Sequence, residues 1–300
     1  MSTLSQKEER NLQIMKIIVI ATAILNVIIG IISILIGENI FFGALSLFCI
    51  ASFTYLVFQG IPMIGWKNAI IAIFIGMACS LFFESMGCNF GLFFSKYTYT
   101  SYIPGPKLLG FDVYSMVGYG IVCYITWAMA QSVASSFDGS FRKGDIVLIP
   151  IIAALLTVSI DLATDPMMAS INNAYVWEER AVYYGIPFQN YLGWYIMAYV
   201  MYQIMGIFFY YQKKHGNMPP VPTVAKKKKH WVLPAIIYGE LFIQLPFYVA
   251  IPGNRLITVG SGTGLYTGDI YRGVLVVYAA AILVPVIIAI MHVMRSKELE

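Results

Sequence analysis

The sequence predicts an all-α fold, a polytopic bundle of about eight transmembrane helices that forms one integral-membrane domain over residues 1–300. Two observations on composition support this: 59% of the residues are hydrophobic and only 11% are charged, whereas soluble globular domains carry about 25% charged residues. The third observation is a series of apolar runs, each near the length of about 20 residues that a spanning helix needs.

Eight segments are expected to span: 16–37, 40–61, 67–84, 113–134, 146–164, 191–212, 231–252 and 272–294. The first two are separated only by a short polar break at Glu38 and Asn39, and the third begins after Gly65 and Trp66. The third and fifth segments end in acidic residues. Since a proline disfavours helix at the residue before it, Pro166 is expected to end the fifth helix near Asp165.

Lys and Arg are distributed unevenly between alternate loops, and this pattern predicts orientation. One set of segments carries fourteen of them and the other carries five. The richer set comprises Lys7, Arg10, Lys16, Lys67, Arg142, Lys143, Lys213, Lys214, Lys226, Lys227, Lys228, Lys229, Arg295 and Lys297, and the poorer set comprises Lys96, Lys107, Arg180, Arg255 and Arg272. We therefore expect a multi-pass protein of the cell membrane with both termini in the cytoplasm. Its net charge of +4 lies in loops that contact membrane lipids, and gives no reason to expect a nucleic-acid partner.

Acidic residues follow the opposite pattern. Those expected on the outer side, or at helix ends facing it, are Glu38, Glu84, Asp112, Asp161, Asp165, Glu178, Glu179 and Asp269. The long segments 85–112 and 163–190 lie on the same side. Because loops longer than about 12–15 residues in a compact protein usually have a function, we expect the functional site at the outer face.

Three carboxyl groups are the strongest candidates for chemistry. Asp161 and Asp165 are four residues apart, so on a helix they share one face. Two poorly solvated carboxylates repel, and one of them is expected to hold a proton at neutral pH. Glu84 follows an apolar run, where an acid is costly unless it is paired or protonated. The structural alternatives are a capping role for Asp161, a turn at Asp165 and an interfacial position for Glu84.

Aromatic side chains surround these acids in the sequence. Trp177, Tyr184 and Trp194 bracket Glu178, and each ring can stabilise a nearby cation by about 0.5–2 kcal/mol. Tyr97 and Tyr99 follow Glu84, where an aromatic belt at the membrane interface is the alternative reading. Glu240 lies inside the seventh span between two prolines and is a weaker candidate than Asp161.

The sequence offers no metal site and no cofactor motif. His215, His230 and His292 have no second His or carboxylate at ligand spacing, and the four cysteines show no CxxC pair. We therefore expect neither a metal nor a redox cofactor.

Two blocks of residues resemble the carotenoid biosynthesis membrane-protein family, which includes bisanhydrobacterioruberin hydratase and bacterial carotenoid 1,2-hydratase relatives. The first block comprises Glu84, Gly87, Phe90, Gly91, Tyr97, Tyr99, Gly105 and Pro106. The second comprises Asp161, Asp165, Pro166, Tyr175, Trp177, Tyr184, Gly185, Ile186, Pro187, Asn190, Gly193 and Trp194. The resemblance covers about residues 67–212. It departs from the family pattern at Phe111 and Asp112, where Val-Pro is usual, and at Tyr175, where Trp is usual.

The resemblance implies a cofactor-independent hydratase that adds water across a terminal double bond of a long isoprenoid polyene drawn from the bilayer. An acid would protonate the alkene, aromatic rings would hold the tertiary carbocation, and amides such as Asn172, Asn173 and Asn190 would hold water. The implied catalytic residues are Asp161, Asp165, Glu84 and Glu178. The implied substrate-binding residues are Tyr97, Tyr99, Tyr175, Trp177, Tyr184, Asn190, Trp194 and Glu240.

Two alternatives remain open from the residues. A membrane prenyltransferase or another isoprenoid-lipid enzyme could use Asp161 and Asp165 to bind Mg²⁺ and a diphosphate. A lipid carrier or channel could use the acids structurally. A di-iron hydroxylase is excluded because such sites need several His at helical spacing.

Overall fold

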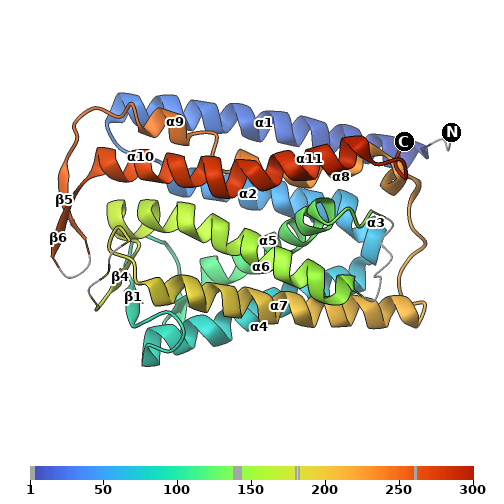
Figure 1. Cartoon of the computed structure of the whole chain (residues 1–300), viewed down its shortest axis with the longest axis horizontal. Helices are drawn as coiled ribbons and strands as arrows, with labels where there is room; N and C mark the ends of the chain where they lie inside the picture. The colour runs from blue at the N-terminus through green and yellow to red at the C-terminus, as the bar shows by residue number, and fades with distance from the viewer. Residues whose placement is uncertain (1–3, 138–143, 180, 182, 260–261) are drawn as a thin grey trace.

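The computed structural model describes residues 4–137, 144–179, 181, 183–259 and 262–300. Within these residues, eight helices are long and apolar enough to cross a membrane, which confirms the predicted all-α transmembrane bundle and its number of spans. Figure 1 shows an elongated bundle with both termini at one end and the strands at the other. We call these the terminal end and the strand end.

Short strands, turns and breaks interrupt the eight spans. The first three are α1 (Gln6–Ile36), α2 (Phe41–Tyr55) continued by η1 (Leu56–Gly60) and α3 (Ile61–Ile64), and α4 (Trp66–Phe90). The next are α5 (Val113–Val133), α6 (Asp145–Asp165) continued by η2 (Pro166–Ile171), and α7 (Phe188–Lys214). The last two are α8 (Lys228–Glu240) with α9 (Leu245–Tyr248), preceded by η3 (Thr223–Lys226), and α10 (Thr267–Val277), η4 (Tyr278–Leu283) and α11 (Val284–Arg295).

The strands form three antiparallel pairs. β1 (Tyr97–Tyr99) pairs with β4 (Tyr175–Trp177), β2 (Lys107–Leu108) with β3 (Phe111–Asp112), and β5 (Leu256–Val259) with β6 (Thr263–Tyr266). In the first pair Tyr97 faces Trp177 and Tyr99 faces Tyr175. This pair therefore ties the loop after α4 to the loop after α6, although they are far apart in the sequence.

The expected end of α6 at Asp165 is confirmed, but Pro166 does not break the span. α6 runs through Asp165, and the chain continues as a wide π-helical turn to Ile171. A proline has no N–H and leaves the carbonyl four residues earlier without its helical donor, which in a bilayer must be satisfied elsewhere. Here the Tyr183 hydroxyl donates to the Leu162 carbonyl at 2.9 Å. The helix therefore tolerates the proline, and Asp165 lies inside the span.

Pro150 gives a second example of this compensation. It lies within α6, and the side-chain amide of Gln203 on α7 donates to the carbonyl of Ile146 at 3.0 Å. The helix is thus hydrogen-bonded to its neighbour at the position where its own ladder lacks a donor. Among the described residues, the α6–α7 pair is the most extensive contact between two helices.

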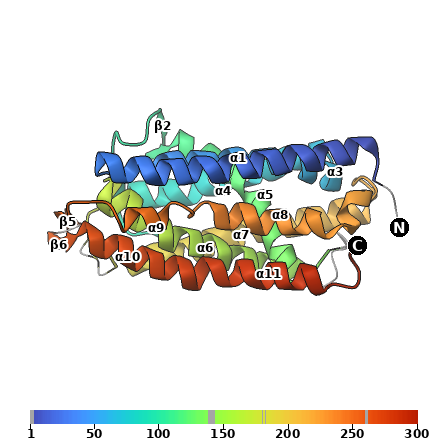
Figure 2. The same cartoon turned by 90° about the horizontal axis from the view of Figure 1, so that it is seen from above.

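Glycines bring α4 and α5 close together. A Cβ on Gly76 would lie 2.9 Å from the Cα of Gly120, and a Cβ on Gly120 would lie 2.9 Å from the Ile73 carbonyl oxygen. Small residues at such contacts allow close backbone approach between membrane helices. On the other side of the bundle, α8 lies between α1 and the α10–α11 span (Figure 2).

The two sets of basic residues predict which end of this bundle lies in the cytoplasm. Arg142, Lys143 and Arg180, which we counted for orientation, lie outside the described residues. Both termini lie at the same end (Figure 1), as an even number of spans requires. Which membrane face that end occupies stays a prediction.

Candidate active site

A cavity of about 140 Å³ lies between α2, α4, α5, α6 and α7, in the half of the bundle nearer the strand end. Its wall is mostly apolar, with polar groups concentrated toward the strand end. Nine residues singled out from the sequence contribute to it: Glu84, Tyr97, Tyr99, Asp161, Asp165, Tyr175, Trp177, Asn190 and Trp194.

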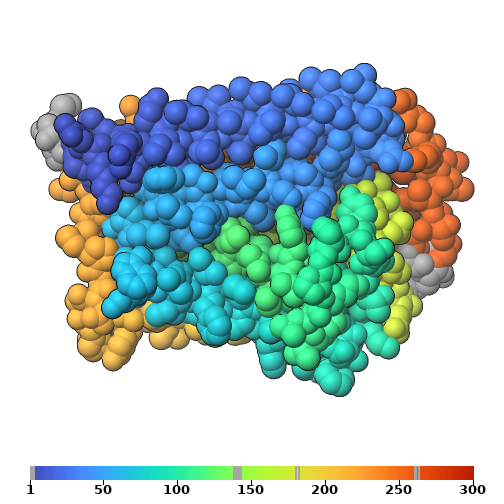
Figure 3. Space-filling model, turned by 180° about the vertical axis from the view of Figure 1, so that it is seen from behind, coloured from blue at the N-terminus to red at the C-terminus, as the bar shows by residue number. Residues whose placement is uncertain are grey.

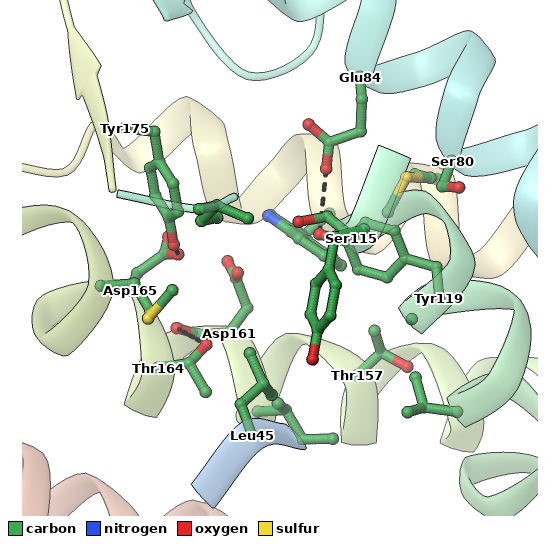
Figure 4. Close-up of a pocket in the computed structure, with 18 of the residues that line it drawn as sticks. Leu45, Ser80, Glu84, Ser115, Tyr119, Thr157, Asp161, Thr164, Asp165 and Tyr175 are labelled. Atoms are coloured by element: carbon green, nitrogen blue, oxygen red, sulfur yellow. Dashed lines mark hydrogen bonds between the residues drawn. The ribbon is translucent and has the colours of Figure 1, made fainter. Parts of the chain in front are cut away.

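Three carboxyl groups converge on this cavity from two helices. Glu84 comes from α4, and Asp161 and Asp165 come from adjacent turns of α6, as Figure 4 shows. Their exposed fractions are 2%, 4% and 2%. In the described part of the chain, no Lys or Arg forms an ion pair with any of them. Since isolated carboxylates are costly to bury, their hydrogen bonds decide how they are held.

One amide bridges the two aspartates. The Asn190 Nδ2 group at the start of α7 donates to Asp161 Oδ2 at 3.0 Å and to Asp165 Oδ2 at 2.7 Å. The same amide group therefore contacts both carboxyls. Two buried carboxylates held at one donor repel each other, and a proton on one of them removes this repulsion.

Asp165 has a further donor in Tyr175, whose hydroxyl donates to Asp165 Oδ1. Burial, together with the nearby charges of Asp165 and Asp161, raises the pKa of Tyr175 well above its usual value. This phenol therefore stays protonated at neutral pH. Asp165 accepts hydrogen bonds at both oxygens, which favours its charged form.

Glu84 is held by two phenols. Tyr97 donates to Oε2, and Tyr119 on α5 donates to Oε1 at 3.2 Å. The ring of Tyr97 lies directly against α4 at Gly87, where a Cβ would be 3.0 Å from Tyr97 Cε1. Gly87 therefore lets the ring reach the carboxylate one turn earlier on the same helix.

Aromatic rings form a continuous shell over the strand end of the cavity. Ring centroids lie 5.6 Å apart for Tyr97 and Trp177, 5.6 Å for Tyr99 and Tyr175, and 5.2 Å for Tyr119 and Trp194. Most of these pairs meet edge to face, the favourable arrangement for aromatic contacts. The shell excludes water from that end and surrounds the acids with ring faces and edges.

Three residues implied by the resemblance lie outside the cavity. Glu178 is exposed and pairs with Lys96 at 3.0 Å. Tyr184 packs on Tyr183 and against α10 at Gly273, because its backbone adopts a left-handed conformation with φ of 51°. Glu240 is buried in a separate place, among residues of α1, α2 and α8. These positions give no contact with the acid cluster.

The amides expected beside Asn190 are also elsewhere. Asn172 exchanges side-chain hydrogen bonds with Asn39, at 3.0 Å and 2.9 Å. The pair joins the start of α2 to the end of η2. Asn190 is thus the member of the predicted amide group that reaches the carboxylates.

Sequence reasoning missed Tyr119. It lies within an apolar span, where a tyrosine gives no distinguishing signal, although glycines flank it on both sides. The strand pairing was also missed. Its signal was present, because the triplets Tyr97–Tyr99 and Tyr175–Trp177 alternate aromatic and small or branched residues with the period of a strand.

Asp112 caps α5 by accepting from the Ser115 N–H at 2.9 Å.

The described residues contain no group of three or more His, Cys, Asp or Glu arranged to hold a metal ion. Residues 41–268 match a family described as carotenoid biosynthesis protein. No curated protein matches the chain, and no solved structure matches it.

Proposed function

Because the chain belongs to the carotenoid biosynthesis protein family and has a role in that process, we propose that it is a hydratase that adds water across a terminal double bond of a linear isoprenoid polyene. The observation that carries the proposal is the hydrogen-bonded cluster of three buried carboxyls at one end of an apolar cavity. An apolar substrate and an acid catalyst can meet there without bulk water.

The hydrogen bonds suggest which carboxyl donates the proton. Glu84 accepts hydrogen bonds from two phenols, and Asp165 accepts from a phenol and an amide. Among the described residues, Asp161 accepts from one side chain, the amide of Asn190. A carboxylate with fewer donors loses less when it is protonated. We therefore assign the catalytic proton to Asp161.

In the first step, the O–H bond of Asp161 breaks and its proton goes to the less substituted carbon of the double bond. The π electrons form the new C–H bond, and the other alkene carbon becomes a tertiary cation. The rings of Tyr119, Trp177 and Trp194 border this space and stabilise a cation through their quadrupoles. The charge of Asp165 lies close by and compensates it.

In the second step, water adds to the cation. Glu84 faces Asp161 across the cavity (Figure 4) and acts as the base that orients the water and accepts its proton. A cavity of about 140 Å³ holds a chain end together with water, since one water needs only about 10–15 Å³ of such space. Transfer of the proton from Glu84 back to Asp161 through cavity water restores the enzyme. The net reaction consumes one alkene and one water.

The test is to incubate the purified protein with a linear polyene in water enriched in ¹⁸O. We expect a product heavier by one water that carries the label, detected by liquid chromatography and mass spectrometry. An unlabelled hydroxyl would indicate oxygen from O₂. Absence of any hydrated product across linear polyenes with unsaturated ends would refute the proposal.

A further inference from the structure

Resting on the proposed function, we propose that the reacting end of the polyene enters the cavity sideways from the bilayer, through a mouth between α2 and α5 formed by Phe42, Ser46, Tyr114 and Gly118. The rest of the chain stays in lipid. The protein would therefore recognise a chain end and not a whole polyene.

The strand end of the cavity is closed to a long apolar molecule. The β1–β4 pair lies across it, and Tyr97, Tyr99 and Trp177 are all buried. Lys107 fixes this cover by donating to the Tyr99 carbonyl. A polyene arriving from water at this end would have to displace a paired, hydrogen-bonded layer.

The side between α2 and α6 is also closed. α10 and η4 pack on α6 there. At the strand end, Asn39 before α2 is bonded to Asn172 after η2, and it also donates to the hydroxyl of Tyr271 on α10 at 3.3 Å. These hydrogen bonds hold the start of α2 against the end of η2 and against α10.

The side between α2 and α5 is lined by residues that belong to both the cavity wall and the outer surface. Phe42, Leu45 and Cys49 on α2 and Tyr114, Gly118 and Val122 on α5 line the cavity, and all are partly or largely exposed. Figure 3 shows this face, on which α2 lies beside the segment that contains α5. The cavity therefore meets the lipid-facing surface here.

One hydrogen bond spans the mouth. Tyr114 and Ser46 hydroxyls are 2.8 Å apart, and Ser46 donates its own proton to the Phe42 carbonyl at 3.0 Å, so Tyr114 is the donor across the gap. The ring of Phe42 packs on Tyr114 with centroids 5.1 Å apart. In hydrocarbon, neither hydroxyl has water as an alternative partner. The bond therefore links α2 to α5 across the mouth, and a chain end that enters there has to separate the two hydroxyls.

One turn after Tyr114 on α5, the residue at the mouth is Gly118, which has no side chain. A Cβ on Gly118 would lie 3.8 Å from Cys49 Sγ, an ordinary contact. A methyl group would fit, whereas a branched side chain would fill the gap. The cavity is also small, about 140 Å³, against about 300–1,000 Å³ for sites that enclose a drug-sized ligand. A long polyene must therefore extend out of it.

The experiment compares Gly118→Leu with Val117→Leu, which places the same leucine side chain at the adjacent residue of α5, exposed and outside the cavity wall. Each protein is expressed with a linear polyene and purified in detergent. Bound polyene per protein is measured by absorbance, and kcat/KM is measured for hydration. We expect Gly118→Leu to lower both by more than about tenfold, and Val117→Leu to change neither by more than about twofold. Gly118→Ala is the control for loss of the glycine itself. We expect its thermal unfolding and its polyene binding to equal those of the wild type, because a methyl group fits at this position.

Polyene binding in a folded Gly118→Leu protein equal to wild type, or no polyene retained by the wild type, would overturn the lateral mouth. The proposed function fails separately: if the wild type hydrates nothing while polyene retention still depends on Gly118, the mouth stands and the hydratase does not. Asp161→Asn should retain bound polyene and lose turnover.

Native cysteines provide a second, independent test. Cys49 lines the cavity beside Gly118 of the mouth, whereas Cys79 is similarly half-buried on α4 but does not line the cavity. In membranes treated with a lipid-soluble maleimide, bound polyene should slow alkylation of Cys49 and leave that of Cys79 unchanged, as measured by peptide mass spectrometry. Equal rates at Cys49 with and without polyene would contradict lateral entry.

Discussion

Replacing Asp161 by Asn tests which carboxyl supplies the catalytic proton. The amide has nearly the same shape as the carboxyl, and its oxygen can still accept the Asn190 hydrogen bond that now measures 3.0 Å to Asp161 Oδ2. The variant should therefore fold, keep the α6–α7 contact and bind polyene. It lacks an acidic proton, so the first step loses its general acid.

The expected loss follows from that single change. General acid catalysis contributes about 10²–10⁴ in rate, which corresponds to about 2.7–5.4 kcal/mol in activation free energy at about 1.36 kcal/mol per decade. We therefore expect kcat for hydration to fall by about 10²–10⁴ in Asp161→Asn, while KM and thermal unfolding change little. Turnover is measured from the hydrated product by chromatography, and binding from the absorbance of polyene retained on the purified protein.

Glu84→Gln separates the two roles assigned to carboxyls. It should impair the water step while leaving the proton on Asp161. Near-normal hydration by Asp161→Asn, together with no hydration by Glu84→Gln, would reverse the assignment and make Glu84 the donor. Normal hydration by both variants would remove the carboxyl cluster from the chemistry altogether.

Further expectations concern the fold, the orientation and the reaction conditions. Tyr183→Phe leaves the Leu162 carbonyl without its donor inside the bundle, and should destabilise the protein by about 1–3 kcal/mol in detergent unfolding. Tyr195→Phe, at a half-buried tyrosine of α7, should have a smaller effect. A cysteine at the exposed Glu179 should react with a membrane-impermeant thiol reagent on intact cells, and one at Lys214 only after permeabilisation; the reverse pattern would invert the topology. Hydration should continue in excess chelator, and loss of activity restored by Mg²⁺ would favour the prenyltransferase alternative.

Hydropathy was sufficient to predict the eight spans because each is an apolar run separated from the next by charged or glycine-containing breaks. It could not place the ends of the third and fifth spans. Glu84 and Asp165 look like boundaries in the sequence, yet α4 continues past Glu84, and η2 continues the fifth span past Asp165. Their charges are tolerated through hydrogen bonds from distant segments, such as Tyr97 to Glu84, and such partners have no local signal.

The acid cluster itself was predictable in part. The spacing of Asp161 and Asp165 places both on one helix face in any register, so their convergence required no tertiary information. Tyr184 and Glu240 show the limit of the same reasoning. The left-handed backbone conformation of Tyr184 turns its ring away from the cavity. Helix packing directs Glu240 into the interface between α1, α2 and α8. Neither effect can be read from composition or period.

The pairing of β1 with β4 also bears on how the chain enters the membrane. α6 carries two carboxyls into the span before α7 has been made, and a central Asp disfavours insertion by about 2.5–3.5 kcal/mol. Both acids lie near the strand end of α6, where they can remain hydrated while the apolar turns from Ile146 to Ile160 cross first. Asn190 arrives with the next helix, and Tyr175 can reach its strand partner Tyr99 only when both loops are in place. The carboxyls would thus lose their water late in biogenesis, when the strand pair closes over them.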